Sequence, residues 1–269
     1  MACVSSSALR RELSERNLAR ADRCEVETTY GAVPSVIYRE EEGLHGNFLE
    51  ASYRAICARP EWAKRLRKSY TASGRVPRAK DRHRYELDCA NSSDALLMNV
   101  FCYPGVLRRR EVCALLGMEA GEVPEFGFKA CVPLLHERVD RTEVDMRLGE
   151  LLVEAKLTET GFQSAPLRLL VRYRDFEEVF ESDELRRVGE RVQGYQLIRG
   201  VLAAYSNEGS YVVLCDGRRA DLTEAWFGVM RAVRSFSLRS RFKLLTWQEL
   251  SDAVPPRLRR FLGEKYGIE

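Results

Sequence analysis

The most constraining feature of the chain is a pair of short apolar runs between Thr142 and Thr160, interrupted by Gly149-Glu150. Apolar runs of this length, joined by two residues of which one is glycine, are typical of a tight β-hairpin. The pattern predicts one strand at Glu143–Leu148 and a second strand at Leu151–Leu157. The rest of the predicted fold is organised around this hairpin.

The predicted strands carry three charged side chains, Asp145, Glu154 and Lys156. Successive residues of a strand point to opposite faces, so Glu154 and Lys156 share one face, and Asp145 on the neighbouring strand can lie level with them. Two carboxylates and an ammonium are costly to hold there for packing alone. Hard oxygen ligands on a rigid base, with a cation beside them, are what a divalent metal needs. The alternative is a surface ladder of salt bridges, which contributes little stability.

The composition indicates a globular protein of 269 residues, 45% hydrophobic and 31% charged, long enough for one large core or two modest ones. Because the net charge is only +3, nucleic-acid binding would have to come from a local patch. The eight cysteines form no CxxC pair, so they predict neither a zinc site nor a disulfide framework. The chain starts without an apolar signal segment and has no run long enough to span a bilayer, so we expect a reduced, cytoplasmic protein without a membrane partner.

The order of predicted elements from about Phe126 onward favours an α/β fold with a mixed sheet flanked by helices. Besides the hairpin, the patterns predict strands at Phe126–Leu134, Tyr211–Cys215 and Phe242–Trp247, and helices at Pro166–Phe180, Glu184–Tyr205, Leu222–Phe236 and Pro256–Tyr266. We expect residues 124–269 to form the core and residues 1–123 a helical N-terminal extension packed on it, as one structural unit.

The hairpin residues resemble a known signature. Asp145, followed nine positions later by Glu154-Ala155-Lys156, resembles the D…(E)xK motif of the PD-(D/E)xK, or restriction-endonuclease-like, nuclease superfamily, although Val144 stands where a proline is common. Further stretches resemble one bacterial subgroup of these nucleases: His45-Gly46-Asn47-Phe48, Glu86–Ser93, Asn99-Val100-Phe101 and Tyr195-Gln196. Asp94 departs from this pattern, because an amide is expected there. The resemblance implies a restriction-endonuclease-like mixed central sheet.

The resemblance also implies roles for the hairpin residues. Asp145, Glu154 and the backbone carbonyl of Ala155 would bind Mg²⁺ or Mn²⁺. Lys156 would orient and help to deprotonate the attacking water and offset charge on the phosphate, although it could also be a solvated edge-strand lysine. Gln196, on the helix after the hairpin, would hydrogen-bond the water or a phosphate, or lie on the helix surface. These roles predict a metal-dependent nuclease, with DNA as the favoured substrate.

Four other residues could support this site. Glu50 could supply a further acidic ligand, although stabilisation of a helix N-terminus explains it equally well. Glu143 and Glu159 could act in an outer shell around the metal. His45, beside Gly46, lies in a predicted turn and is either a site residue or a structural one.

A basic segment is the predicted contact with nucleic acid, because runs of this kind bind backbone phosphates. Its members are Arg78, Lys80, Arg82 and Arg84, preceded by Lys64 and Lys68. A charged, solvated face is the alternative. Two other functions also stay open at this point: an inert nucleic-acid-binding module, and a protein–protein regulator, which a sheet with Asp145 facing away from Glu154 would favour. The oligomeric state is open, a homodimer included.

Overall fold

The computed structural model describes residues 3–21, 26–29, 34–69 and 84–269. The chain forms two compact units. One unit is Val123–Thr246 with the start of the chain, and the other is Ser5–Glu122 with Trp247–Glu269. The last two helices of the chain pack with N-terminal helices and belong to the second unit.

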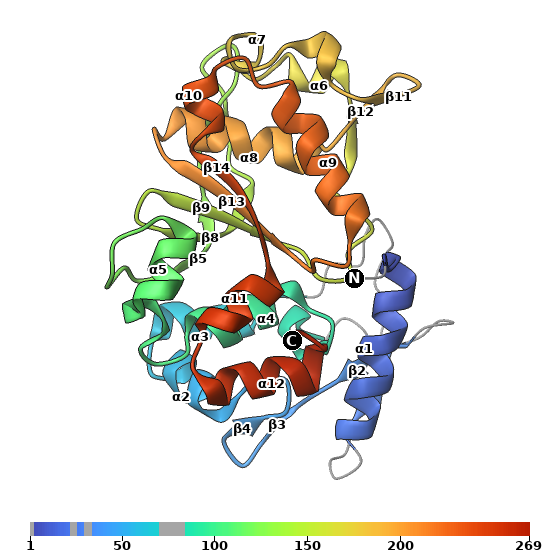
Figure 1. Ribbon diagram of the computed structural model, residues 1–269, viewed down its shortest axis with the longest axis vertical. Coiled ribbons are helices and arrows are strands. Elements are labelled where there is room, and N and C mark those ends of the chain that lie inside the picture. Colours follow the sequence, from blue (N-terminus) through green and yellow to red (C-terminus); the bar gives the residue numbers. More distant parts are fainter. Residues whose placement is uncertain (1–2, 22–25, 30–33, 70–83) are drawn as a thin grey trace. The chain divides into compact units, whose positions relative to one another are not determined.

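The first unit is built on a five-stranded mixed sheet, which confirms the predicted α/β fold class (Figure 1). The strand order is β14-β13-β9-β8-β5, antiparallel from β5 to β9 and parallel from β9 to β14. The strands are β5 (Glu125–Lys129), β8 (Glu143–Leu148), β9 (Leu151–Ala155), β13 (Ser210–Cys215) and β14 (Phe242–Thr246).

The predicted hairpin is confirmed as β8 and β9, joined by Gly149 and Glu150. Gly149 adopts a φ of 56°, the left-handed region that a turn of this length requires and that glycine enters without steric cost. Every residue of β9 is buried, since β9 has a neighbouring strand on each side and helix α8 (Tyr195–Ser206) packed against it. A charged side chain on β9 is therefore held away from water.

Helices cover one face of this sheet. The main ones are α8 (Tyr195–Ser206) and α9 (Ala220–Arg231), which lie side by side (Figure 1). Their apolar side chains share a core with Leu152, Tyr211 and Val213 of the sheet. The unit also contains α6 (Leu167–Leu170), α7 (Phe176–Val179), η4 (Ser182–Glu184), α10 (Phe236–Arg239), the pair β6 (Val132–Pro133) and β7 (Val139–Asp140), and a small sheet of β10 (Ser164–Pro166), β12 (Arg191–Gln193) and β11 (Arg187–Val188).

The second unit is mainly helical, and α4 (Ser93–Phe101) is buried along its whole length. Helix α12 packs against α1, and α11 packs against α5, which is why the C-terminal residues belong to this unit. Its helices are α1 (Ser6–Arg20), α2 (Glu50–Cys57), α3 (Pro60–Leu66), η2 (Glu86–Asp88), η3 (Val106–Arg108), α5 (Arg110–Leu116), α11 (Trp247–Ala253) and α12 (Pro256–Tyr266). Its strands pair as β1 (Glu27–Thr28) with β2 (Val36–Ile37), and β3 (Glu40–Glu41) with β4 (Leu44–His45).

Two predicted helices are wrong in extent. The one predicted at Glu184–Tyr205 begins only at Tyr195, because Gly189 and Gly194 take φ values of 58° and 78°, which a helix cannot accommodate. The residues before it form η4 and the β11–β12 hairpin. The helix predicted at Pro166–Phe180 is two short helices, interrupted where Tyr173 bridges to Leu134. No helix in the described ranges is both long enough and apolar enough to cross a membrane.

Candidate active site

The hairpin brings Asp145 and Glu154 together. Met146 pairs with Val153, so the next pair in the same antiparallel register is Asp145 with Glu154. An Oδ2 atom of Asp145 accepts a hydrogen bond of 2.8 Å from the backbone N–H of Ala155, which ties the carboxylate to the second strand. Asp145 is half-buried and Glu154 is only 5% exposed. Directly opposed carboxylates on neighbouring strands repel each other, so this arrangement needs a positive charge nearby.

Lys156 supplies a positive charge at the end of β9. Its Nζ donates a 2.6 Å hydrogen bond to Oε1 of Glu154, and the lysine is itself 5% exposed. Burial by itself would lower the pKa of Lys156, but the charges of Glu154, Glu159 and Asp145 outweigh burial and raise the pKa above its ordinary value. Lys156 is therefore an ammonium at neutral pH.

The backbone on both sides of Lys156 is fixed by hydrogen bonds. Its N–H donates to the carbonyl of Leu214 in β13 at 2.8 Å, and the following N–H, of Leu157, donates to the Glu159 carboxylate at 2.6 Å. Its Nζ lies 5.7 Å from the centre of the Phe162 ring. The predicted outer-shell residue Glu159 thus lies beside the cluster, where its carboxylate acts on both the charge of Lys156 and the backbone after it.

Sequence reasoning missed Arg219, which anchors the same segment from α9. This arginine is fully buried, and its guanidinium donates to the carbonyl of Leu157 at 3.3 Å and to the carbonyl of Glu159 at 2.9 Å. An ion pair of 2.8 Å with Asp221 holds the guanidinium in place and lowers the pKa of that carboxyl group. Arg219 therefore positions the chain that follows Lys156. Its signal in the sequence is the arginine pair that follows a buried strand and Asp216-Gly217, which by itself resembles an ordinary charged turn.

The buried electrostatics extend to Tyr211 in β13. Burial raises the pKa of this phenol, and the charges of Glu154 and Asp145 raise it further. The Tyr211 hydroxyl is buried and has no hydrogen-bond partner among the described residues. The ring packs against α8 at Gly200, where an added Cβ would lie 2.3 Å from the Tyr211 Cζ atom. Gly200 is therefore the residue that lets α8 approach the sheet next to the charged cluster.

The donor set of this cluster fits a hard divalent cation. Asp145 and Glu154 offer carboxylate oxygens, Ala155 offers a backbone carbonyl, and three carboxylates act on a single ammonium, which leaves a local excess of negative charge. Over the described ranges, no group of three or more His, Cys, Asp and Glu side chains is placed to hold a metal. Asp145 and Glu154 are two such side chains, so a metal here would also need ligands of another kind, for which the Ala155 carbonyl is a candidate.

Two further predicted residues lie on elements that adjoin the hairpin. Gln196 is the second residue of α8 and is half-buried, and its N–H donates to the carbonyl of Phe162 at 3.0 Å. That bond places the start of α8 against the loop that follows Lys156. Glu143 opens β8 and is exposed, and its carbonyl accepts a 3.5 Å hydrogen bond from Arg199 of α8.

Glu50 and His45 belong to the other unit. Glu50 is ion-paired with Arg54 at 2.6 Å and with Arg257 at 3.5 Å. Both ring nitrogens of His45 are engaged, since Nδ1 accepts from the Asn47 N–H at 3.2 Å and Nε2 lies 3.3 Å from an oxygen of Asp88. These contacts support a structural part for both side chains within their own unit.

The motif residues that precede the hairpin in the sequence meet in that second unit. The Asn47 side chain donates to the carbonyls of Leu87 and Cys89, and Asn99 donates to the Asn47 carbonyl at 3.1 Å and accepts from the Leu49 N–H at 2.7 Å. Three stretches that are far apart in the sequence are thus joined by buried amide groups. This network gives the amide side chains of these stretches a structural part.

The predicted phosphate-binding residues have different environments. Arg78, Lys80 and Arg82 lie outside the described residues. Arg84 is 7% exposed, and Lys68 is ion-paired with Asp94 at 2.7 Å and with Glu86 at 3.2 Å. Lys64, on α3, is exposed. The pairing of Lys68 also explains Asp94, the acid found where an amide was expected.

Comparison with known protein families gives a match over nearly the whole chain. Residues 15–267 match the model of the REase-ARP family, described as restriction endonuclease associating with ARP. The chain belongs to this family. The match spans both units and includes the whole β8–β9 hairpin. Searches of curated proteins and of solved structures gave no significant match. Membership of the REase-ARP family is consistent with the restriction-endonuclease resemblance of the hairpin.

Proposed function

We propose that the chain is a divalent-metal-dependent nuclease of the PD-(D/E)xK type that hydrolyses phosphodiester bonds in DNA. The observation that carries the proposal is the buried end of the hairpin, where Asp145 lies beside Glu154 and Lys156 is bonded to Glu154. Membership of a family described as restriction endonucleases supports the same activity. From that description alone, the proposal includes that the enzyme works in association with ARP.

Asp145, Glu154 and the Ala155 carbonyl would hold Mg²⁺ or Mn²⁺. When bound, such an ion polarises the phosphate and lowers the pKa of a coordinated water. The protein contributes rigidity, because the Asp145 carboxylate is fixed by a backbone N–H and Glu154 is enclosed in a central strand. A rigid ligand base holds the reacting groups in place without reorganisation during the reaction.

Lys156 acts as a charged hydrogen-bond donor in this proposal. Since the surrounding carboxylates raise its pKa, the side chain enters the reaction already protonated. It can orient the attacking water and offset the negative charge that develops on the phosphate. Its raised pKa supports this part over that of the direct proton acceptor. Gln196 would add a neutral hydrogen bond from the start of α8.

The test is cleavage of plasmid and single-stranded DNA with Mg²⁺ or Mn²⁺ by the wild type, Glu154→Gln and Lys156→Met. We expect metal-dependent cutting that falls by about 100-fold or more in each variant, the usual loss for one transition-state contact. Glu125→Ala is the matched control, because Glu125 is an exposed carboxylate of the same sheet whose ion pair with Arg147 lies at the surface. Equal cutting by the wild type and both site variants would disprove the assignment of the hairpin as the active site.

If the wild type cuts neither DNA nor RNA but binds DNA with a strong salt dependence, the inert binding module replaces the nuclease. The arrangement that would have favoured a protein–protein regulator, with Asp145 turned away from Glu154, is not the one observed.

A further inference from the structure

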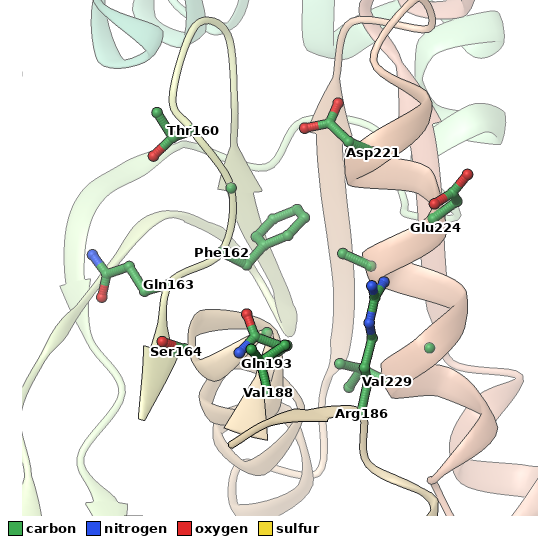
Figure 2. Close-up of a pocket in the computed structure, with 14 residues that line it drawn as sticks. Thr160, Phe162, Gln163, Ser164, Arg186, Val188, Gln193, Asp221, Glu224 and Val229 are labelled. Carbon is green, nitrogen blue, oxygen red and sulfur yellow. The ribbon is translucent and has the colours of Figure 1, made fainter. Parts of the chain in front are cut away.

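A cavity of about 410 Å³ lies in the first unit between the loop after the hairpin, the β11–β12 hairpin and α9 (Figure 2). Phe162 and Val229 are buried residues of its apolar lining. Arg186, Gln193 and Glu224 are among its polar residues. None of these residues was singled out by the sequence.

This cavity adjoins the candidate active site through a shared loop. The Phe162 ring lines the cavity and also lies 5.7 Å from the Nζ atom of Lys156. The carbonyl of Phe162 accepts the N–H of Gln196, and Arg219 at the start of α9 holds the carbonyls of Leu157 and Glu159. A substrate strand whose phosphate is held at Lys156 would therefore have its neighbouring nucleotide within reach of the cavity.

Gly228 indicates that the cavity is kept open. It lies inside α9, where glycine costs roughly 0.5–1 kcal/mol relative to alanine. A Cβ added to Gly228 would meet nothing within 4 Å, so packing within the described chain does not require a glycine there. Gly200 differs in this respect, because the Tyr211 ring occupies the place that a Cβ would take. An open face at Gly228 is explained if a ligand outside the chain approaches the helix closely.

The polar lining suits a nucleobase better than a phosphate. Asp221 and Glu224 would repel a phosphate at this wall, and the ion pair of Asp221 with Arg219 lowers the pKa of that carboxyl group and keeps it charged. The edge of a base presents both hydrogen-bond donors and acceptors, which carboxylate, amide and guanidinium groups can read. Figure 2 shows the Phe162 ring directed toward α9 and the Gln193 side chain at the other side of the space, near Ser164 and Val188. The Gln193 Nε2 donates a 3.3 Å hydrogen bond to the Arg191 carbonyl.

We propose that this cavity binds a nucleobase of the substrate strand next to the scissile phosphate, with Gln193 as a specificity-determining residue. The proposal rests on the proposed nuclease function, because the nucleobase belongs to the strand that the candidate active site would bind. Gln193 is placed for this by β12, whose register with β10 sets it opposite Ser164 at the rim of the cavity. An amide can both donate to and accept from a base edge, so it can favour one base over others.

The experiment measures binding without cleavage. Fluorescent single-stranded oligonucleotides of dA, dC or dT are titrated with the wild type, Gly228→Leu and Gln193→Ala in EDTA. We expect the wild type to prefer one of the three bases by about tenfold, the scale of one good base contact. Gly228→Leu should weaken binding of the preferred oligonucleotide by about tenfold, because the leucine fills the cavity, and Gln193→Ala should abolish the preference.

Phe227→Leu is the matched control. This variant introduces a leucine at the neighbouring position of α9. The Phe227 side chain is 62% exposed and does not line the cavity, so the variant should bind like the wild type. If Gly228→Leu does not fold, Gln193→Ala tests the opposite wall. The proposal is overturned if Gly228→Leu binds like the wild type, if the preference survives in Gln193→Ala, or if the wild type binds all three oligonucleotides equally or not at all.

The two proposals fail separately. Metal-dependent cutting that is lost in Glu154→Gln but unaffected by Gly228→Leu, with unchanged oligonucleotide binding, would leave the nuclease and reject the nucleobase cavity. Base-selective binding that Gly228→Leu weakens, without any cutting by the wild type, would leave the cavity and reject the nuclease.

Discussion

Lys156 should be essential for stability as well as for activity, and Lys156→Met tests this directly. The ammonium is 5% exposed and lies 2.6 Å from an oxygen of Glu154, with Asp145 and Glu159 close enough to affect its pKa. Methionine keeps much of the side-chain length and loses the charge. The substitution would leave the buried carboxylate of Glu154 without its nearest counter-charge.

The expected loss is about 3–5 kcal/mol in the free energy of unfolding, the usual cost of removing one member of a buried ion pair. Coulomb's law gives a similar scale, about 4 kcal/mol for unit charges 4 Å apart at an effective dielectric constant of 20. The double variant Lys156→Met/Glu154→Gln should recover much of this loss, because neither buried charge remains. A double-mutant cycle then isolates the coupling between the two side chains.

The pH dependence of this loss has a defined sign. Lys156 has a raised pKa in the folded state, so the stability that it contributes is fully present below its ordinary pKa and is lost as the pH rises through the folded value. The difference between the wild type and Lys156→Met should therefore stay constant through neutral pH. It should shrink only in strongly alkaline solution.

Divalent metal provides an independent readout of the same site. An ion that binds only the folded state stabilises it by about 2.7 kcal/mol at a concentration 100 times its Kd. Mg²⁺ or Mn²⁺ should therefore raise the unfolding temperature of the wild type, should raise that of Lys156→Met at least as much, and should have little effect on Glu154→Gln. Calorimetry measures the shifts, and hydrogen exchange of the β8–β9 amides assigns them to the first unit. Lys156→Met unfolding at the wild-type temperature, with unchanged exchange, would refute the reasoning.

Two other substitutions test the packing around these features. Gly200→Ala should lower the free energy of unfolding by about 1–3 kcal/mol, because the added Cβ would overlap the Tyr211 ring, despite the better helix propensity of alanine. Urea unfolding measures this loss, and an unchanged midpoint would contradict the contact. Lys265→Met, in α12, should be more stable than the wild type at neutral pH, since burial and the charge of Arg20 hold the pKa of Lys265 well below its ordinary value. Because Lys265 binds its proton more tightly in the unfolded chain, the free energy of unfolding of the wild type should rise by at most about 1.4 kcal/mol per pH unit. Lys265→Met should lack this pH dependence. Equal pH dependence of the two proteins in urea titrations would exclude the lowered pKa of Lys265 as its cause.

The hairpin could be predicted from the sequence because its signals are local. Two apolar runs and the Gly149-Glu150 turn specify the strands, and the register that follows places Asp145 opposite Glu154. The helix that begins at Tyr195 was predicted too long, because Gly189 and Gly194 act through left-handed backbone conformations that a hydrophobic pattern does not reveal. The two units were harder still. The joining of α12 to α1 depends on contacts between opposite ends of the chain, such as the bond from Lys265 to Asn17.

The site was predictable only in its motif residues. Asp145, Glu154 and Lys156 stand at a recognisable spacing, whereas Arg219 and Gly228 act through their position in three dimensions. Arg219 is buried and bonded to the backbone after Lys156, which no charge pattern could indicate. Gly228 is informative only once its Cβ direction is known to be empty.

Features that cost stability are concentrated around one loop of the first unit. The desolvation of the charges of Lys156 and Glu154, a Tyr211 hydroxyl with no hydrogen-bond partner among the described residues and an open glycine within α9 each oppose folding. The ion pair and Gly228 both border the cavity or the loop of Phe162. Cost alone does not identify a site, because Lys265 is also buried and costly, and its neighbour Glu264 likewise lines a cavity, between α1 and α12. What distinguishes the hairpin is that three carboxylates act on its buried lysine, whereas Lys265 donates to the neutral amide of Asn17. Residues that lower the stability of the fold and meet at an open surface are expected where a sequence is constrained by a ligand as well as by its own core.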